Sequence, residues 1–350
     1  MTVDKADHRS HKNNKNASLD FMDAFYAFMY ADFSDVLENG EDIAVAVSGG
    51  ADSMALCHAL SRMHSGHVYA ITVDHGLRPE ARVEAEYVAQ VFVEHGNLSH
   101  HILTWAHDDA PHARVQEQAR AARYALMAGF MREKGVRCLF LGHHMDDQAE
   151  TFLFRLAKGS GLDGLSCMAA RAAFDDGGVF LCRPMLSLPK ADMVAYCAAQ
   201  GIEYIDDPSN QSDKYARVRL RQSMEVLATE GLTPKRLSVT ASRIARAREA
   251  LDIMSDRAYN HLSKKNNERI EINLKSLVSE PQEIVLRVVL RAMDDVITTK
   301  GYGARMERVE SLCEDLRLLQ GFRKRTLGGI IFEVRAGGDS LILHPERNEV

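Results

Sequence analysis

A serine- and glycine-rich loop carries the clearest chemistry in the sequence. It reads Ser48-Gly49-Gly50-Ala51-Asp52-Ser53 and follows the apolar run Ile43–Val47. Glycines let the backbone approach a phosphate closely, and the N–H groups of the loop and of a following helix then point into one concavity. Ser48 and Ser53 can add hydroxyl donors, while Asp52 can hold Mg²⁺ or contact a nucleotide. The loop therefore predicts a phosphate-binding site. The alternative is a turn capped by Asp52.

Two other nucleotide-binding patterns do not fit. No G-x-x-x-x-G-K-S/T segment occurs, which excludes a Walker-type loop. Residues 159–164, GSGLDG, match G-x-G-x-x-G, but they follow an expected helix instead of a strand. The dinucleotide-binding interpretation therefore fails its structural context. A glycine-rich helix end followed by a loop explains this segment better.

The elements that must position the loop alternate regularly. Short apolar runs, typical of strands buried on both faces, are separated by stretches with helical spacing. The expected strands are Ile43–Val47, Val68–Val73, His101–Trp105, Cys138–Leu141 and Val179–Cys182. The expected helices are Phe21–Val36, Met54–Met63, Pro79–Glu94, Val115–Glu133, Asp146–Ala157 and Lys190–Gln200.

This alternation predicts an α/β fold, a doubly wound parallel sheet with helices on both faces. Open sheets of this kind bind ligands at the carboxyl ends of their strands. Three polar clusters follow predicted strands: Ser48–Ser53, Asp74-His75-Gly76 and Gly142–Asp147. We therefore predict that all three clusters belong to one site.

The pattern changes near residue 215. Long helical stretches follow, and a glycine-containing connection between Thr326–Val334 and Ser340–His344 predicts a terminal hairpin. We predict a disordered tail over residues 1–20, because it is polar and has no apolar segment. The α/β domain is expected at 21–215, and a smaller, mainly helical domain with the hairpin at 216–350.

Composition narrows the class of protein. No apolar run is long enough to cross a bilayer, and the first residues do not resemble a signal peptide. The six cysteines form no C-x-x-C pair, so neither a disulfide framework nor a zinc or iron–sulfur site is indicated. A cytoplasmic protein is expected. The net charge is −6, yet residues 217–248 form a basic segment that contains only Glu225 and Glu230 as acids.

Several segments together resemble the PP-loop, or N-type, ATP pyrophosphatases, and among them the tRNA(Ile)-lysidine synthases. The similarity spans about residues 40–222, roughly half of the chain. Besides the loop it rests on Val73-Asp74-His75-Gly76-Leu77-Arg78, Ala119-Arg120-Ala121-Ala122-Arg123-Tyr124, Gly142-His143-His144-Met145-Asp146-Asp147-Gln148-Ala149-Glu150-Thr151, and Asp207-Pro208-Ser209-Asn210 with Arg217 downstream. It implies an adenine nucleotide alpha hydrolase-like fold.

The resemblance also implies a reaction. That family forms a carbon–nitrogen bond as a ligase: ATP adenylates the 2-carbonyl oxygen of the wobble cytidine in tRNA(Ile) with a CAU anticodon, and free L-lysine then displaces AMP. Pyrophosphate is released in the first step, and the product changes decoding from AUG to AUA. The substrates implied are ATP with Mg²⁺, lysine and tRNA(Ile). A homodimer remains open.

Site residues follow position by position. The resemblance implies that Ser48, Gly49, Gly50, Ala51, Asp52 and Ser53 bind ATP, with Asp52 near its metal, and that Asp52, Arg123, His143 and Asp147 are catalytic. A guanidinium such as Arg123 can stabilise charge on the α-phosphate, and Asp147 or His143 can accept a proton from lysine. Candidates for binding lysine are Asp74, Asp146 and Glu150. Candidates for binding tRNA are Arg217, Arg221, Arg243 and Arg246.

Each assignment has a structural alternative. Arg120 and Arg123 can be surface charges of one helix, and Asp146 and Asp147 suit the first turn of a helix in any protein. His143 can merely hydrogen-bond within its loop. The rival functions are a tRNA-thiolating PP-loop enzyme, an amide-forming relative, and a non-catalytic module that binds ATP or tRNA. Thiolating relatives generally use cysteines, and a non-catalytic module would not release pyrophosphate.

Overall fold

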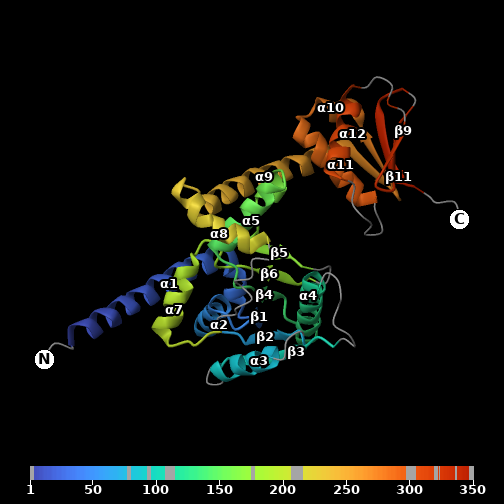
Figure 1. The fold of residues 1–350 in the computed structure, drawn as a ribbon. Helices are drawn as coiled ribbons and strands as arrows, with labels where there is room; N and C mark the ends of the chain where they lie inside the picture. Colours follow the sequence, from blue (N-terminus) through green and yellow to red (C-terminus); the bar gives the residue numbers. More distant parts are fainter. Residues whose placement is uncertain are drawn as a thin grey trace. The chain divides into compact units, whose positions relative to one another are not determined.

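The chain forms two compact units, residues 1–245 and 246–350 (Figure 1). The computed structural model describes residues 4–76, 80–92, 96–106, 115–174, 178–205, 216–296, 305–318, 322, 324–335 and 337–346. Helix α9 (Pro234–Leu262) runs across the boundary between the units. Among these residues, no helix is both long and apolar enough to span a membrane.

The first unit is built on a six-stranded sheet in the order β3-β2-β1-β4-β6-β5. All neighbouring strands are parallel except β5, which is antiparallel to β6. The strands are β1 (Ile43–Ala46), β2 (Val68–Asp74), β3 (Leu98–Thr104), β4 (Cys138–Phe140), β5 (Arg171–Ala173) and β6 (Phe180–Cys182). The predicted α/β fold with a mostly parallel sheet is confirmed.

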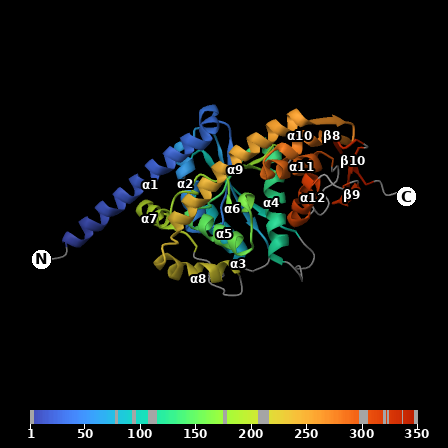
Figure 2. The ribbon, with the colours of Figure 1, turned by 90° about the horizontal axis from the view of Figure 1, so that it is seen from above.

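Helices cover both faces of this sheet. Alternate residues of β1 point to opposite sides: Ile43 and Val45 pack with α1, α2 and α7, while Ala44 packs with α4. Figure 2 shows α1, α2 and α7 grouped on one side of the unit and α4 on the other. The helices are α1 (Asp4–Asn39), α2 (Ala51–Met63), α3 (Glu80–Val91), α4 (Val115–Lys134), α5 (Met145–Ala157), α6 (Leu162–Leu165), α7 (Lys190–Gln200) and α8 (Ala216–Thr229).

Helix α1 begins earlier than the sequence suggested. The backbone is helical from Asp4, whereas we predicted a disordered tail over residues 1–20. No Gly or Pro occurs before Gly40, so nothing in the sequence ends the helix there. The second part of α1 is anchored to the core by Phe25, Met29 and Phe33, which are fully buried.

The prediction of a mainly helical C-terminal domain was wrong. The second unit contains a five-stranded antiparallel sheet in the order β7-β8-β11-β10-β9. Its strands are β7 (Ser263–Asn266), β8 (Arg269–Asn273), β9 (Lys324–Leu327), β10 (Ile330–Val334) and β11 (Ser340–Pro345). The helices α10 (Leu274–Ser279), α11 (Gln282–Val296) and α12 (Met306–Leu318) complete the unit.

The predicted hairpin of the second unit is confirmed, but the additional strands β9 and β7 were not predicted. β10 and β11 pair antiparallel, as predicted. Gly328 and Gly329 have φ values of +61° and +75° and split the predicted run Thr326–Val334 into β9 and β10. β7, which reads Ser-Lys-Lys-Asn, has no apolar alternation, so only its pairing with β8 reveals it as an edge strand.

Candidate active site

The serine- and glycine-rich loop joins β1 to α2, as the sequence predicted. The backbone N–H of Ser48 donates to Ser53 Oγ at 3.1 Å, and the two hydroxyl oxygens are 3.2 Å apart. Ser53 Oγ donates to the carbonyl of Gly50 at 3.0 Å. Gly50 precedes the first turn of α2 without a side-chain cap, so the N–H groups there are left for a ligand. This geometry suits an anion at a helix N-terminus.

Gly49 takes a backbone conformation that other residues adopt only with strain. Its φ is +86°, and its carbonyl accepts from the N–H of Ile205 at 2.8 Å. A Cβ added there would lie 2.9 Å from Ile205 Cδ1 and 3.2 Å from Val88 Cγ2. The loop therefore needs glycine both for its dihedral angle and for space.

Gly49→Ala is expected to destabilise the protein by about 1–2 kcal/mol, because an alanine at positive φ is strained, and to weaken ATP binding. Urea unfolding and ATP titration measure the two effects. Gly129→Ala is the matched control, since a Cβ on Gly129 of α4 meets nothing within 4 Å. That change should stabilise by about 0.5–1 kcal/mol. Equal effects of both changes would contradict the special role of Gly49.

Gly142 brings the end of β4 against the loop helix. A Cβ on Gly142 would lie 3.1 Å from the backbone N of Ser53 and from the carbonyl carbon of Asp52. The sequence analysis included Gly142 only as part of a longer segment. The structure shows why a glycine is needed there: two backbones approach closely. It places the two histidines that follow β4 beside the first turn of α2.

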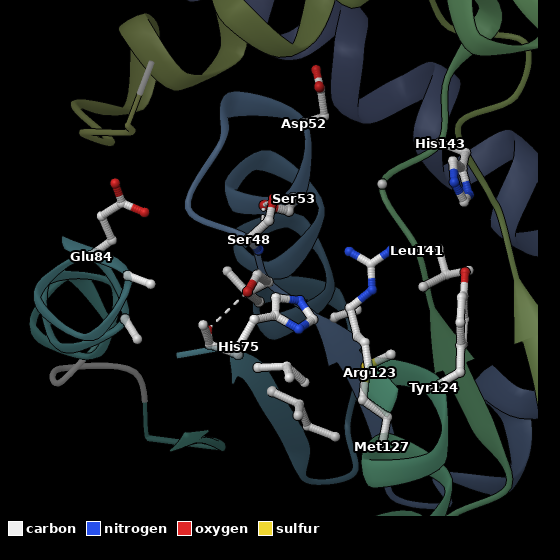
Figure 3. Close-up of a pocket in the computed structure, with 18 residues that line it drawn as sticks. Ser48, Asp52, Ser53, His75, Glu84, Arg123, Tyr124, Met127, Leu141 and His143 are labelled. Atoms are coloured by element: carbon white, nitrogen blue, oxygen red, sulfur yellow. Dashed lines mark hydrogen bonds between the residues drawn. The ribbon is translucent and has the colours of Figure 1, made fainter. Parts of the chain in front are cut away.

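A cavity of about 350 Å³ opens at this edge of the sheet (Figure 3). Ser48, Asp52, Ser53, Arg123 and His143, all predicted from the sequence, line it. Its remaining lining is largely apolar and includes Ile71, Val73, Ala81, Ala85, Met127 and Leu141. Apolar walls beside a phosphate loop fit the base and the phosphates of a nucleotide.

Arg123 directs its guanidinium into the cavity, towards the side where Ser48 and Ser53 lie (Figure 3). It is half-buried, and burial lowers its pKa, although a guanidinium stays charged. No carboxylate of the described residues forms an ion pair with it; its neighbour is the ring of Tyr124, 5.6 Å from Cζ. A half-buried cation without a counter-charge is arranged to meet an anion. The surface-charge alternative therefore does not describe Arg123.

The adjacent histidines His143 and His144 have opposite charge states. Burial, followed by the charges of Arg183, Arg120, His144 and Arg123, lowers the pKa of His143 to about 3, so its ring is neutral. Burial also lowers the pKa of His144, but the aspartates around it prevail and raise it to about 10. The site thus has a cationic side, where arginines lie near the neutral His143, and an acidic side, where carboxylates surround the protonated His144.

His144 lies among three carboxylates, a role that the sequence did not reveal. Its Nε2 is 3.5 Å from Oδ2 of Asp52 and 3.5 Å from Oδ2 of Asp147, and its Nδ1 is 3.5 Å from Oδ2 of Asp146. Only 4% of its side chain is exposed. The imidazolium therefore links the loop helix α2 to the first turn of α5. The feature that identifies His144 is its burial next to three carboxylates, and only the fold brings these groups together.

Asp52 keeps one oxygen free for a cation. Its Oδ2 faces His144 and lies 3.9 Å from Nζ of Lys190, while its Oδ1 is buried without a hydrogen-bond partner among the described residues. A buried carboxylate oxygen with no partner is costly unless a ligand meets it. A hard divalent cation that prefers oxygen ligands, such as Mg²⁺, fits this donor.

Asp146 and Asp147 both also serve the structure. Asp147 Oδ2 accepts the backbone N–H of His144 at 3.0 Å at the start of α5. Asp146 Oδ2 accepts the backbone N–H of Lys190 at 2.9 Å at the start of α7. The Asp147 contact is the capping alternative raised from the sequence, whereas Asp146 binds the start of a different helix, α7. Asp147 nevertheless remains next to His144 and Asp52.

The three candidates for binding lysine do not converge. Asp74 ends β2, is buried, and accepts the N–H of Gly76 at 2.9 Å. Glu150 is buried on α5. Neither these two nor Asp146 lines the cavity.

The candidates for binding tRNA lie on two helices. Arg217 and Arg221 belong to α8, but their side chains lie outside the described residues, as does the segment Asp207-Pro208-Ser209-Asn210. Arg243 and Arg246 are exposed on α9, and no ion pair within the described part of the chain holds either. Their charges are therefore free for an external anion.

Comparison with known proteins agrees with this geometry. The PP-loop domain family matches residues 24–227. The tRNA(Ile)-lysidine synthase of Methylobacterium nodulans is 42% identical over 313 residues, covering 87% of this chain and 91% of the relative. The enzyme of the same name from a Wolbachia strain of Brugia malayi is 33% identical over 327 residues, covering 91% of this chain and 74% of the relative.

A solved structure supports the fold alone. A U34-tRNA thiolase from Methanococcus maripaludis has a TM-score of 0.53 with 17% identity, and the match covers 64% of this chain and 78% of that one. The family match and the identity over most of the chain carry the assignment further. By these similarities the chain belongs to the tRNA(Ile)-lysidine synthases, a family of PP-loop enzymes that use ATP.

Proposed function

We propose that this chain joins free L-lysine to the wobble cytidine of tRNA(Ile) with a CAU anticodon, using ATP. The observation that carries the proposal is one cavity lined by the phosphate loop, by His143 and by the guanidinium of Arg123, which has no carboxylate partner among the described residues. The membership in the lysidine synthase family supplies the substrates. Both the tRNA and free lysine are available in the cytoplasm, where we expect the enzyme to act.

The first step is adenylation. The 2-carbonyl oxygen of cytidine attacks the α-phosphorus of ATP, and the bond to pyrophosphate breaks. In this proposal the Ser48–Ser53 loop and the N-terminus of α2 hold the phosphates. Arg123 meets the charge that develops on the α-phosphate. Mg²⁺, when bound at Asp52, would neutralise the phosphates.

The second step forms the carbon–nitrogen bond. The ε-amine of lysine attacks ring carbon 2, and AMP leaves with the former carbonyl oxygen. The amine must first lose a proton, and Asp147 is the favoured acceptor because it is a carboxylate on the acidic side of the site, whereas burial and the nearby arginines lower the pKa of His143. An ammonium group is attracted to that side.

Lys190 supports this placement of the lysine ammonium. Its own Nζ lies 3.9 Å from Asp52 Oδ2, so the acidic side already accepts an alkylammonium group within the chain. We therefore favour a lysine site at Asp52, Asp146 and Asp147 over one at Asp74 or Glu150. Of the predicted candidates, this retains Asp146.

Radiolabelled lysine tests the function directly. With ATP and a CAU-anticodon tRNA(Ile), the enzyme should release AMP and incorporate one lysine per AMP. Release of AMP without incorporation of lysine would refute the lysidine reaction. A tRNA whose wobble base is uridine is the control, because it has no cytidine at the position to be modified.

A thiolating function is less well supported. The structural relative that thiolates tRNA shares only the fold. Such chemistry in related enzymes uses cysteines, yet no cysteine lines the cavity in the described part of the chain. All six cysteines are buried.

Arg243 and Arg246 are proposed to contact tRNA phosphates. Reversal of both charges to Glu should weaken tRNA binding and lower the slope of log K against log salt by about two, one for each lost contact. Titration of tRNA at several salt concentrations measures this. Arg305→Glu with Arg308→Glu, also exposed, is the charge-matched control. Equal losses in both variants would indicate a general effect of charge.

A further inference from the structure

Two arginines flank Tyr124 on the cationic side of the site, and a third, Arg183, lies near enough to act on the same groups electrostatically. Arg120 donates from Nη2 to the Tyr124 hydroxyl at 3.4 Å, and its Cζ lies 5.0 Å from the ring centroid. Arg123 lies 5.6 Å from the same centroid. Arg183 directly follows β6. After burial, its charge and those of Arg120 and Arg123 lower the pKa of His143. The cluster therefore joins α4 to the carboxyl end of β6.

Hydrogen bonds to the backbone hold Arg183 in place, and no described carboxylate pairs with it. Its Nη1 donates to the carbonyl of Ala169 at 2.9 Å, and its N–H donates to the carbonyl of Ala170 at 2.8 Å. Its Nε is buried and has no hydrogen-bond partner in the part of the chain that the structure describes. Among the described residues, no carboxylate forms an ion pair with Arg120 or Arg183. A fixed, half-buried guanidinium without a carboxylate partner is suited to a phosphate.

The position of Arg183 separates it from the ATP phosphates. The phosphate loop follows β1, and β4 lies between β1 and β6 in the sheet. Two strand spacings place the end of β6 roughly 10 Å from the loop. Arg123 lines the cavity and Arg183 does not. The ATP phosphates are thus served by the loop and Arg123, which leaves Arg183 for a second anion.

We propose that Arg183, assisted by Arg120, binds the backbone phosphate of the nucleotide that carries the target base. This inference rests on the proposed function, in which that base must reach the α-phosphate beside Arg123. The backbone phosphate of that nucleotide is separated from the reacting base atoms by the ribose, and we place it on the β6 side of the site. Arg183 is accordingly a substrate-binding residue that orients the base.

A cycle of protein and RNA changes tests this contact. Wild type and Arg183→Gln are titrated with an anticodon stem-loop RNA that carries either the natural phosphodiester or a neutral methylphosphonate 5′ of the target cytidine. Each single change should weaken binding about 10- to 100-fold, as expected for a charge-assisted hydrogen bond. The two together should cost no more than one alone, because they remove the same interaction.

Separate measurements distinguish the loss of this contact from a loss of ATP binding or of the fold. The affinity of Arg183→Gln for a non-hydrolysable ATP analogue should equal that of wild type, which also shows that the fold is intact, and Arg183→Lys should recover part of the RNA affinity. Arg137→Gln, an exposed arginine before β4, is the control. Additive losses in the cycle, or a loss of ATP analogue affinity with unchanged RNA binding, would overturn the proposal. Incorporation of lysine by wild type tests the proposed function independently of this contact.

Discussion

Asp52→Asn is expected to lower the rate of AMP formation by at least about 10²–10³-fold, the loss typical when one group that stabilises developing charge is removed. The amide is nearly the same size as the carboxylate but cannot neutralise Mg²⁺. The buried Oδ1, which has no hydrogen-bond partner among the described residues, is the proposed contact for that cation. Raising the Mg²⁺ concentration should restore part of the activity, because the variant loses affinity for the metal. Steady-state assays over a range of Mg²⁺ measure both effects.

Asp35→Asn is the control for this change. Asp35 pairs with Arg171 at 2.7 Å, and 55% of its side chain is exposed, away from the cavity. The pair is at the surface and contributes little, so activity should stay at the wild-type level. Wild-type activity in Asp52→Asn at low Mg²⁺ would remove Asp52 from the site.

Arg123→Gln is expected to lower kcat by about 10²–10³-fold with a smaller change in the KM for ATP. The guanidinium would act mainly on the charge that develops during attack at the α-phosphate. Arg123→Lys should be nearly as inactive, since an ammonium group cannot reproduce the planar set of donors. Rapid-quench measurement of a single turnover separates this chemical step from binding.

Thermal unfolding distinguishes a functional arginine from one that supports the fold. Arg123 is half-buried without a carboxylate partner among the described residues, so its removal should raise the melting temperature of the ligand-free protein. Arg132→Gln, an exposed position on the same helix, should change neither activity nor melting temperature appreciably. A strongly destabilised Arg123→Gln protein would show that Arg123 supports the fold.

The parts that the sequence predicted are those governed by local pattern. Buried apolar runs such as Ile43–Val47 identify parallel strands, and glycines directly after a strand identify a phosphate loop. Because the carboxyl ends of parallel strands share one edge, Ser48 and His143 could be placed at one site from the sequence pattern, whereas Arg123, on helix α4, was placed there only by the family resemblance.

The parts that were missed depend on pairing and burial. β7 is polar and is a strand only because β8 pairs with it, so the second unit was taken as mainly helical. His144 gains its charge from aspartates on two helices, Asp52 on α2 and Asp147 on α5. Arg183 stands alone in its stretch of sequence, and only the order β1-β4-β6 shows that its strand ends two positions from the strand that carries the phosphate loop. The spacing of apolar and polar residues along the sequence does not predict such contacts.

The order of the two proposed chemical steps is tested most directly by following the α-phosphate of ATP. In a single turnover without lysine, ATP labelled at the α-phosphorus should transfer its label to tRNA(Ile), because the base is adenylated first. Addition of lysine should then release the label as AMP while one lysine enters the tRNA. Transfer of the label to lysine instead of tRNA would contradict the account, since lysine itself would then be the activated group.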